Sequence, residues 1–229
     1  MITPTLHKQH LISVLKFIYN DPITRGSLGF KGGTAAMIFY DLPRISVDLD
    51  FNLLNKKQET KIFTHLQSKL INFGQLKESY KKRFTLFYLI NYQKGQRNIK
   101  VEISRRGNDS KFKAKSYLGV PMLVMTKPDM MANKLMALVD RKYPAARDFF
   151  DVWYFLSQHW EINFDLIKNR LQLTPKQILN QAIKLVTAQE KNFFLQGLGE
   201  LLDEKQKSWV RDHLQKELLF ELRLAKEVL

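Results

Sequence analysis

The clearest pattern in the chain is the alternation of polar and apolar residues from Ser46 to Phe51. A period of two predicts a half-buried strand, because successive side chains on a strand point to opposite faces. Asp48 and Asp50 would therefore project together from one face of that strand. Two adjacent carboxylates repel each other, and a hard divalent cation such as Mg²⁺, which prefers oxygen ligands, relieves that repulsion.

A glycine turn precedes the acidic strand. Gly32 and Gly33 follow a short strand predicted at 27–30 and begin a helical segment that ends at 41–43. Adjacent glycines let the backbone come close to a ligand, and the N–H groups at the start of a helix suit a phosphate. The order of turn, helix and acidic strand predicts a nucleotidyl transfer site. Each half also has a plain alternative, since the glycines could form only a turn and the aspartates only a solvated strand face.

Apolar periodicity predicts the remaining elements. Further strands are predicted at 85–92, 98–104 and 121–125. Helices are predicted at 6–19, within 55–72, and at 127–139, 145–159, 174–186, 192–202 and 209–228. From Asn163 onward the pattern is helical throughout. We therefore predict an α+β core at residues 1–120 and a helical C-terminal lobe at residues 121–229.

The net charge of +15 narrows the choice of partners. Between Lys77 and Lys115 there are twelve Lys and Arg residues against three Asp and Glu, with aromatic residues among them. Basic clusters attract polyanions, and exposed rings stack on bases, so this segment favours contact with nucleic acid. The alternatives are a basic protein whose aromatics belong to its core, and an acidic protein partner.

Several classes of protein are disfavoured. The absence of cysteine removes disulfides and cysteine-based zinc sites, and the five histidines have no metal-binding spacing. No Walker loop or Gly-x-Ser-x-Gly motif is present. No apolar run approaches the roughly 20 residues of a membrane span, and the first residues lack the apolar core of a signal peptide. We expect a cytoplasmic protein with no membrane contact.

Two motifs resemble a known family. Residues 31–34 (KGGT) followed by 44–51 (RISVDLDF) resemble the nucleotidyltransferase signature of the polymerase β superfamily. Within that superfamily the chain is similar to the AbiEii/AbiGii toxins, which include the MenT-type toxins. Residues 134–137 (KLMA) with Arg141, and then 147–151 (RDFFD), resemble the family's second signature. The resemblance covers residues 25–156 and implies a nucleotidyltransferase fold, with a mixed β-sheet flanked by helices.

The resemblance assigns roles to the residues of the first motif. Asp48 and Asp50 would be catalytic, and they would bind two Mg²⁺ ions. The nucleotide would be bound by the residues around the glycine turn and the start of the acidic strand, which are Gly32, Gly33, Thr34, Arg44 and Ser46. Arg44 has bracing of the aspartate loop as its alternative role, and Lys31 is a secondary candidate for a phosphate contact.

The helical lobe would contribute Lys134 and Asp148 to the site. Lys134 would bind the triphosphate together with Arg141, although a lysine among apolar neighbours commonly extends to solvent. Asp148 would orient these cations or contact the nucleotide, and Arg147 and Asp151 are secondary candidates. Both aspartates also have a structural alternative, because negative charge is favoured in the first turn of a helix.

Glu102 stands where the superfamily often places a third carboxylate. It would act as the base toward the attacking hydroxyl or as a ligand of the second metal ion. An exposed glutamate on a basic strand is the alternative, and the family's commoner residue here is aspartate.

The implied function is that of a Mg²⁺-dependent toxin of a toxin–antitoxin system that transfers nucleotides from an NTP to RNA. The leading acceptor is the 3′ end of tRNA, and the resemblance implies a cognate antitoxin whose direct contact with the toxin stays open. Transfer to a protein hydroxyl or a small molecule is one alternative. A non-catalytic module that binds RNA or protein on the same fold is another.

Overall fold

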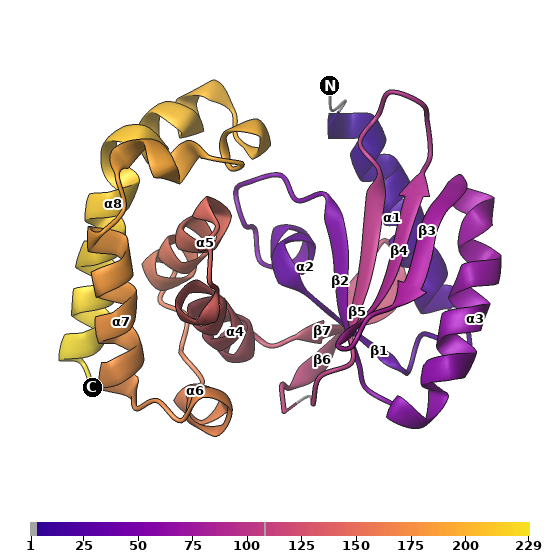
Figure 1. Ribbon diagram of the computed structural model, residues 1–229, viewed down its shortest axis with the longest axis horizontal. Helices are drawn as coiled ribbons and strands as arrows, with labels where there is room; N and C mark the ends of the chain where they lie inside the picture. The colour runs from indigo at the N-terminus through magenta and orange to yellow at the C-terminus, as the bar shows by residue number, and fades with distance from the viewer. Residues whose placement is uncertain (1–3, 108) are drawn as a thin grey trace. The chain divides into compact units, whose positions relative to one another are not determined.

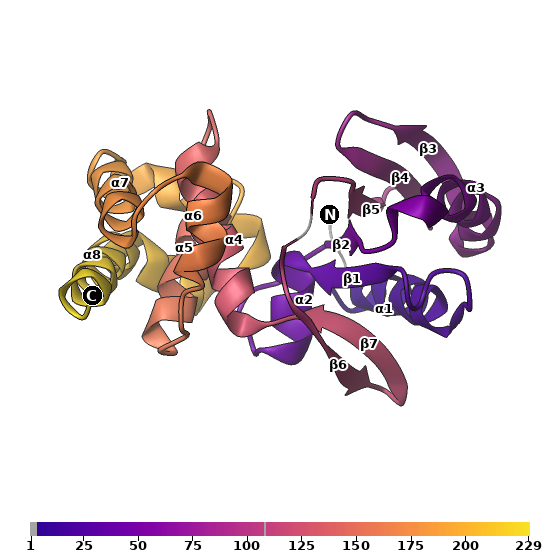
Figure 2. The same cartoon turned by 90° about the horizontal axis from the view of Figure 1, so that it is seen from below.

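The computed structural model describes residues 4–107 and 109–229, and the chain divides into two compact units, Met1–Met125 and Thr126–Leu229 (Figures 1 and 2). The first unit ends at Met125, five residues after the predicted boundary at residue 120, because the strand that follows that boundary belongs to its sheet. Each unit has its own apolar core.

The first unit is a seven-stranded sheet with three α-helices. Its helices are α1 (Pro4–Asn20), α2 (Gly32–Phe39) and α3 (Glu59–Lys69), with 3₁₀ turns η1 (Lys56–Gln58) and η2 (Leu70–Phe73). Its strands are β1 (Leu28–Lys31), β2 (Asp48–Leu53), β3 (Gln75–Lys81), β4 (Thr85–Asn91), β5 (Ile99–Ser104), β6 (Phe112–Tyr117) and β7 (Val120–Met125).

The sheet is mixed, in the order β3-β4-β5-β2-β1-β7-β6. β2 pairs in parallel with β5, and β1 pairs in parallel with β7, while the other neighbours are antiparallel. The predicted α+β class with a mixed, helix-flanked sheet is confirmed by this topology.

The two faces of β2 differ as the alternation predicts. Leu49 and Phe51 are fully buried, whereas Asp48 and Asp50 are half-buried. Tyr19 of α1 packs on Phe51, so α1 covers the apolar face. The opposite face of β2 carries both aspartates.

The second unit is helical. It contains α4 (Lys127–Asp140), α5 (Ala146–Ser157), α6 (Phe164–Leu171), α7 (Pro175–Thr187), η3 (Lys191–Leu195), η4 (Gly199–Leu201) and α8 (Glu204–Glu227). α4 packs against α5, α6 and α7, and α8 packs against α5 and α7. α7 begins with a capping box in which Thr174 and Gln177 exchange hydrogen bonds, which fixes its start where the sequence predicts it.

One sequence prediction is wrong, and two strands were missed. The helix predicted at 192–202 is two 3₁₀ turns, because Gly197 between them has a φ of 65°, outside the helical region. Strands β3 and β6 were not predicted from the sequence. β3 reads QLKESYK and β6 reads FKAKSY, and both are edge strands whose two faces carry polar residues.

Within the part of the chain that the structure describes, no helix has both the length and the apolarity to cross a bilayer.

Candidate active site

The parallel pairing of β2 with β5 places three carboxylates together. Asp48 and Asp50 leave the same face of β2, and the register sets Asp50 beside Glu102 of β5. Register partners on adjacent strands share a face of the sheet, with strands about 4.8 Å apart. Glu102 is therefore a direct neighbour of the aspartate pair, although sequence alone gave no register between the strands.

The carboxyl group of Glu102 holds a proton more tightly than that of an ordinary glutamate. Burial raises the pKa of Glu102 above its ordinary value, and the carboxylates of Asp50 and Asp48 raise it further, while Lys100 and Lys82 act in the opposite direction. Burial and like charges both disfavour a second negative charge. A carboxyl poised in this way can take up a proton, which is what a general base must do.

Lys100 was not recognised from the sequence as part of this cluster. The register sets it beside Asp48, and its Nζ lies 3.4 Å from Asp48 Oδ2. The ammonium partly offsets the charge of the carboxylates. The signal that could have identified it was its place on the polar face of the strand, two residues before Glu102.

The two glycines at the start of α2 are required by close contacts within the site. Gly32 has a φ of 80°, and a Cβ there would lie 2.5 Å from Asp50 Oδ2. A Cβ at Gly33 would lie 2.6 Å from Arg44 Nη2 and 2.8 Å from Ser46 Oγ. Only glycine lets the backbone come this close to the acidic strand, and the first N–H groups of α2 lack partners within the helix.

The Thr34 hydroxyl is used inside the protein. Thr34 is fully buried, and its hydroxyl donates to the backbone carbonyl of Asp48, 2.5 Å away. Because that hydroxyl has one proton, the Ser46 hydroxyl, 2.9 Å from Thr34 Oγ1, donates to it in turn. These bonds join α2 to β2, so the predicted phosphate contact of Thr34 depends on its backbone N–H.

Arg44 and Lys31 flank the acidic strand differently. Arg44 is buried, and its Nη1 donates to the carbonyl of Ile45, 3.0 Å away. This placement supports the bracing role considered for Arg44. Lys31 is half-buried, and the β1–β2 register sets it beside Asp50 on the side opposite Glu102.

A buried histidine supports the residue that precedes Asp48. His7 Nε2 lies 3.0 Å from the carbonyl oxygen of Val47, and His7 Nδ1 lies 3.0 Å from the Tyr92 hydroxyl. Since the carbonyl can only accept, Nε2 carries a proton and donates it to Val47. The histidine links α1 to the acidic strand, and no sequence motif marks it.

The donor chemistry of the carboxylate cluster fits Mg²⁺. Enzymes commonly hold Mg²⁺ with one or two carboxylates together with the phosphates of the substrate. Asp48 and Asp50 provide two such carboxylates, and Gly32 places no side chain against Asp50 Oδ2. Among residues 4–107 and 109–229, no three His, Asp or Glu side chains form a ready-made metal site. The aspartate pair thus fits an ion that also requires substrate oxygens.

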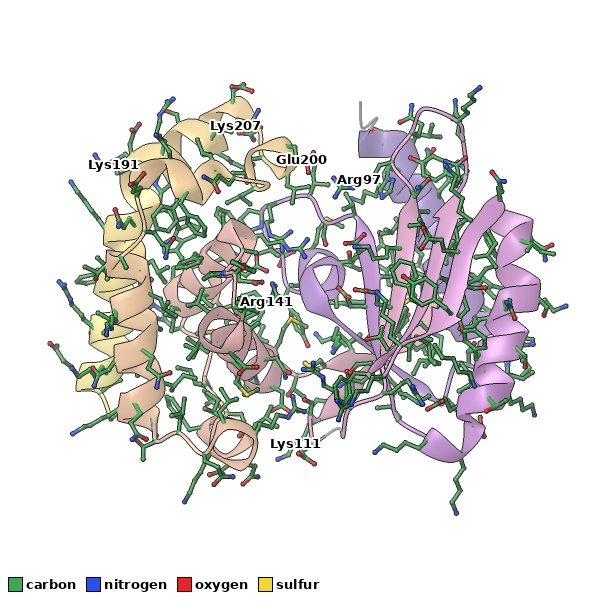
Figure 3. The ribbon with its side chains drawn as sticks, viewed as in Figure 1. Arg97, Lys111, Arg141, Lys191, Glu200 and Lys207 are labelled. Atoms are coloured by element: carbon green, nitrogen blue, oxygen red, sulfur yellow. The ribbon has the colours of Figure 1, made fainter. Side chains whose placement is uncertain are left out.

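The second unit holds the other predicted residues in one ion-pair cluster. Lys134 Nζ of α4 lies 2.8 Å from Asp148 Oδ1 and 2.7 Å from Asp151 Oδ2 of α5. Arg141, which follows the last residue of α4 (Figure 3), pairs with the other oxygen of Asp148. The side chains of Asp148 and Asp151 are 1% and 0% exposed.

This arrangement favours a positioning role for the two aspartates. Their buried carboxylates are engaged with Lys134 and Arg141, so contact with a nucleotide would require them to leave those partners. The charges of two cations and two anions also cancel within the cluster. Arg147, on the first turn of α5, is half-buried.

Comparisons with known proteins give a family and a fold. The family model described as "Nucleotidyl transferase AbiEii toxin, Type IV TA system" matches residues 17–221. No curated protein sequence matches the chain closely enough to count as a relative. The structure of JHP933 from Helicobacter pylori is similar with a TM-score of 0.62 at 19% identity, over 100% of this chain and 94% of that one.

A second Helicobacter pylori structure, described as a candidate nucleotidyltransferase, also has a TM-score of 0.62 at 19% identity. The match covers 100% of this chain and 96% of that one. At 19% identity, the similarity to these two structures shows the fold of this chain.

Proposed function

Because the chain belongs to the AbiEii family of nucleotidyl transferase toxins, we propose that it transfers a nucleotide from an NTP to the 3′ end of an RNA, in a reaction that requires Mg²⁺. The observation that carries this proposal is the juxtaposition of Asp50 and Glu102 on adjacent parallel strands. The glycine turn that begins α2 lies against the same aspartate. The groups proposed to bind phosphate and to accept the proton are thus neighbours in one unit.

The residues of the first unit have separate tasks in this reaction. The backbone N–H groups of Gly33 and Thr34, at the start of α2, would bind phosphate oxygens. Asp48 and Asp50 would hold Mg²⁺, which supplies charge neutralisation at the phosphates. Glu102 would accept the proton of the attacking 3′-hydroxyl as its oxygen bonds to the α-phosphorus, and pyrophosphate would leave.

The cations of the second unit remain candidates for the triphosphate. Lys134 and Arg141 are fixed by ion pairs with Asp148, which pre-orients both donors. A pre-oriented cation stabilises developing negative charge without reorganisation. Replacement of Lys134 by Met should therefore weaken NTP binding, which can be measured without any acceptor.

The acceptor and the antitoxin follow from different observations. The basic segment between Lys77 and Lys115 supports RNA as the acceptor, and the family resemblance makes the 3′ end of tRNA the proposed site. Membership of a toxin family implies a cognate antitoxin, which would act in the cytoplasm with or without lasting contact.

The test is transfer of label from nucleotide to RNA. Purified protein is incubated with total RNA, Mg²⁺ and each α-labelled NTP in turn, beside Asp48→Asn and the surface control Asp212→Asn. Asp212 is exposed on α8 and serves as a matched charge change. We expect a labelled RNA band with the wild type and with Asp212→Asn, and at least a 100-fold loss with Asp48→Asn.

The other outcomes reassign the function. Label in protein rather than RNA would move the acceptor to a side-chain hydroxyl. Full activity of Asp48→Asn would exclude the proposed role of the aspartate pair. NTP binding without any transfer, in RNA from several sources, would favour a non-catalytic binding module.

A further inference from the structure

The carboxylate row continues across the sheet as aromatic side chains. The register sets Glu102 of β5 beside Phe87 of β4, and Phe87 beside Tyr80 of β3. Register partners share a face, so both rings lie on the face that carries Asp50. Phe87 is two strand spacings, about 10 Å, from Asp50. Figure 1 shows these strands as neighbours in the sheet.

The two rings form a stacked pair capped by a cation. Their centroids are 4.8 Å apart with an interplanar angle of 19°. Lys82 Nζ lies 5.1 Å from the centroid of Tyr80 and 4.8 Å from that of Phe87. Tyr80 is 36% exposed, whereas Phe87, on which it stacks, is buried. The Lys82 ammonium also acts electrostatically on Glu102, so the pair and the carboxylate belong to one electrostatic environment.

A second exposed ring lies at the turn between β3 and β4. Phe84 is 43% exposed, and the guanidinium carbons of Arg83 and Arg106 each lie 4.9 Å from its ring centroid. Aromatic rings and guanidinium planes are the groups on which unpaired bases stack. Among the described residues, neither arginine has a carboxylate within ion-pair distance, so their charges remain available to phosphates.

The turn that carries these groups is held in place by Arg105. Its Nη1 donates to the carbonyl of Lys82 at 2.6 Å, and its backbone N–H donates to the carbonyl of Phe84 at 2.8 Å. Arg105 Nε in turn lies 2.8 Å from Glu59 Oε2 on α3. The rings are therefore presented on a braced turn, which lowers the entropy lost when a ligand binds.

We propose that this surface, which we call the ring platform, binds the unpaired 3′ end of a nucleic-acid acceptor. The ring platform consists of Tyr80, Lys82, Arg83, Phe84, Phe87 and Arg106. Bases stack on its rings, phosphates contact its cations, and the terminal hydroxyl is directed toward Glu102. An acidic peptide would satisfy the cations but leave the ring faces unused, so nucleic acid is the occupant that uses both. The inference rests on the proposed function for the orientation of the strand.

Binding can be tested separately from transfer. Fluorescence anisotropy with a short, labelled single-stranded RNA, in EDTA and without NTP, would compare the wild type with Tyr80→Ala, Phe84→Ala and Lys82→Ala. Phe220→Ala and Lys216→Ala on α8 are the matched controls, because both residues are exposed and lie outside the ring platform. Circular dichroism would verify that each variant is folded.

We expect each ring variant to weaken binding about 5- to 100-fold. Lys82→Ala should lower the slope of log affinity against log salt by about one. The controls should bind as the wild type does, and a blunt duplex should bind more weakly than the single strand. The same ring variants should lose transfer to RNA while NTP binding stays unchanged.

Two results would overturn the inference. One is equal binding of single-stranded RNA by the wild type and all three platform variants. That result would overturn the ring platform even if transfer to RNA is observed. The other is binding of an acidic peptide with no measurable binding of RNA. If the platform variants lose RNA binding in a protein that transfers no nucleotide, the ring platform stands and the proposed function fails.

Discussion

Glu102 on β5 lies directly beside Asp50 on β2, in the same register that sets Lys100 beside Asp48. Three of these four residues are acidic, and Lys100 is the one basic member of the group. The pairing therefore creates a carboxylate pair with one raised pKa next to a lysine–aspartate contact. Several consequences of this arrangement can be measured.

Replacement of Glu102 by Gln should reduce nucleotide transfer about 10²- to 10⁴-fold, which is the usual contribution of a positioned base. NTP affinity should change little, because the glutamine keeps the size of the side chain. Single-turnover transfer and equilibrium NTP binding separate the two effects. Glu78→Gln, at an exposed position of β3, is the control. Wild-type transfer by Glu102→Gln would show that the glutamate is not the base.

The same substitution should change stability in a pH-dependent way. Because the pKa of Glu102 is raised in the folded protein, its contribution to stability is present below the unfolded pKa and is lost as the pH rises through the folded pKa. The unfolding free energy of Glu102→Gln relative to wild type should thus increase over that range and then level off. Urea unfolding in EDTA at a series of pH values would show this, and a difference that falls with pH would contradict it.

Gly32→Ala should disturb the site more than it disturbs the fold. The new Cβ would meet Asp50 Oδ2, and a positive φ costs alanine about 1–2 kcal/mol. We expect a loss of transfer of at least tenfold with a modest fall in the melting temperature. Gly199→Ala is the matched control, since a Cβ there meets nothing within 4 Å. Equal activity of the two variants would rule out a role for the close approach at Gly32.

Asp151→Asn should destabilise the second unit by less than the roughly 3–5 kcal/mol of a buried charge left alone, because Lys134 keeps Asp148 as a partner. Lys134→Met should destabilise it as well, since Asp151 would then be buried without its lysine. The double variant should lose less than the sum of the two, because neither charge is left alone. Denaturant unfolding of the wild type, the two single variants and the double variant would measure these free energies. If the two losses simply add in the double variant, the pair is not coupled.

Lys100→Met should increase the affinity for Mg²⁺. Its ammonium lies beside Asp48 and is partly exposed, so the contact is worth about 0.4–1 kcal/mol. The Mg²⁺ concentration that gives half-maximal transfer should therefore fall about two- to fivefold. Lys216→Met on α8 should leave it unchanged. A rise with Lys100→Met would indicate instead that the lysine helps to bind the nucleotide.

The local elements of the site were predictable because short patterns determine them. Alternation fixed the faces of the strand at Asp48 and Asp50, and Thr174 followed by Pro175 marked the start of α7. Gly32 and Gly33 were identified as a turn, and the structure adds the contacts that require them.

What could not be predicted depends on pairing between distant segments. The neighbours of Glu102 follow from the β2–β5 register, which no local pattern encodes. The contact of Lys100 with Asp48 follows from the same register. The internal hydrogen bond of the Thr34 hydroxyl could not be predicted either, because it depends on how α2 packs against β2. His7 likewise contacts Val47 only through the tertiary fold.

The parallel register of β2 and β5 also determines which changes in chain length the protein tolerates. The chain between these strands passes through α3 and the β3–β4 hairpin, where loops can lengthen without moving either strand. One residue inserted or deleted between Ile99 and Glu102 would instead turn every later side chain to the opposite face. Ile103 would then stand among the carboxylates and Glu102 in the apolar core. Divergence in length should therefore concentrate in the loops within residues 54–98 and be excluded from the paired strands, β5 above all.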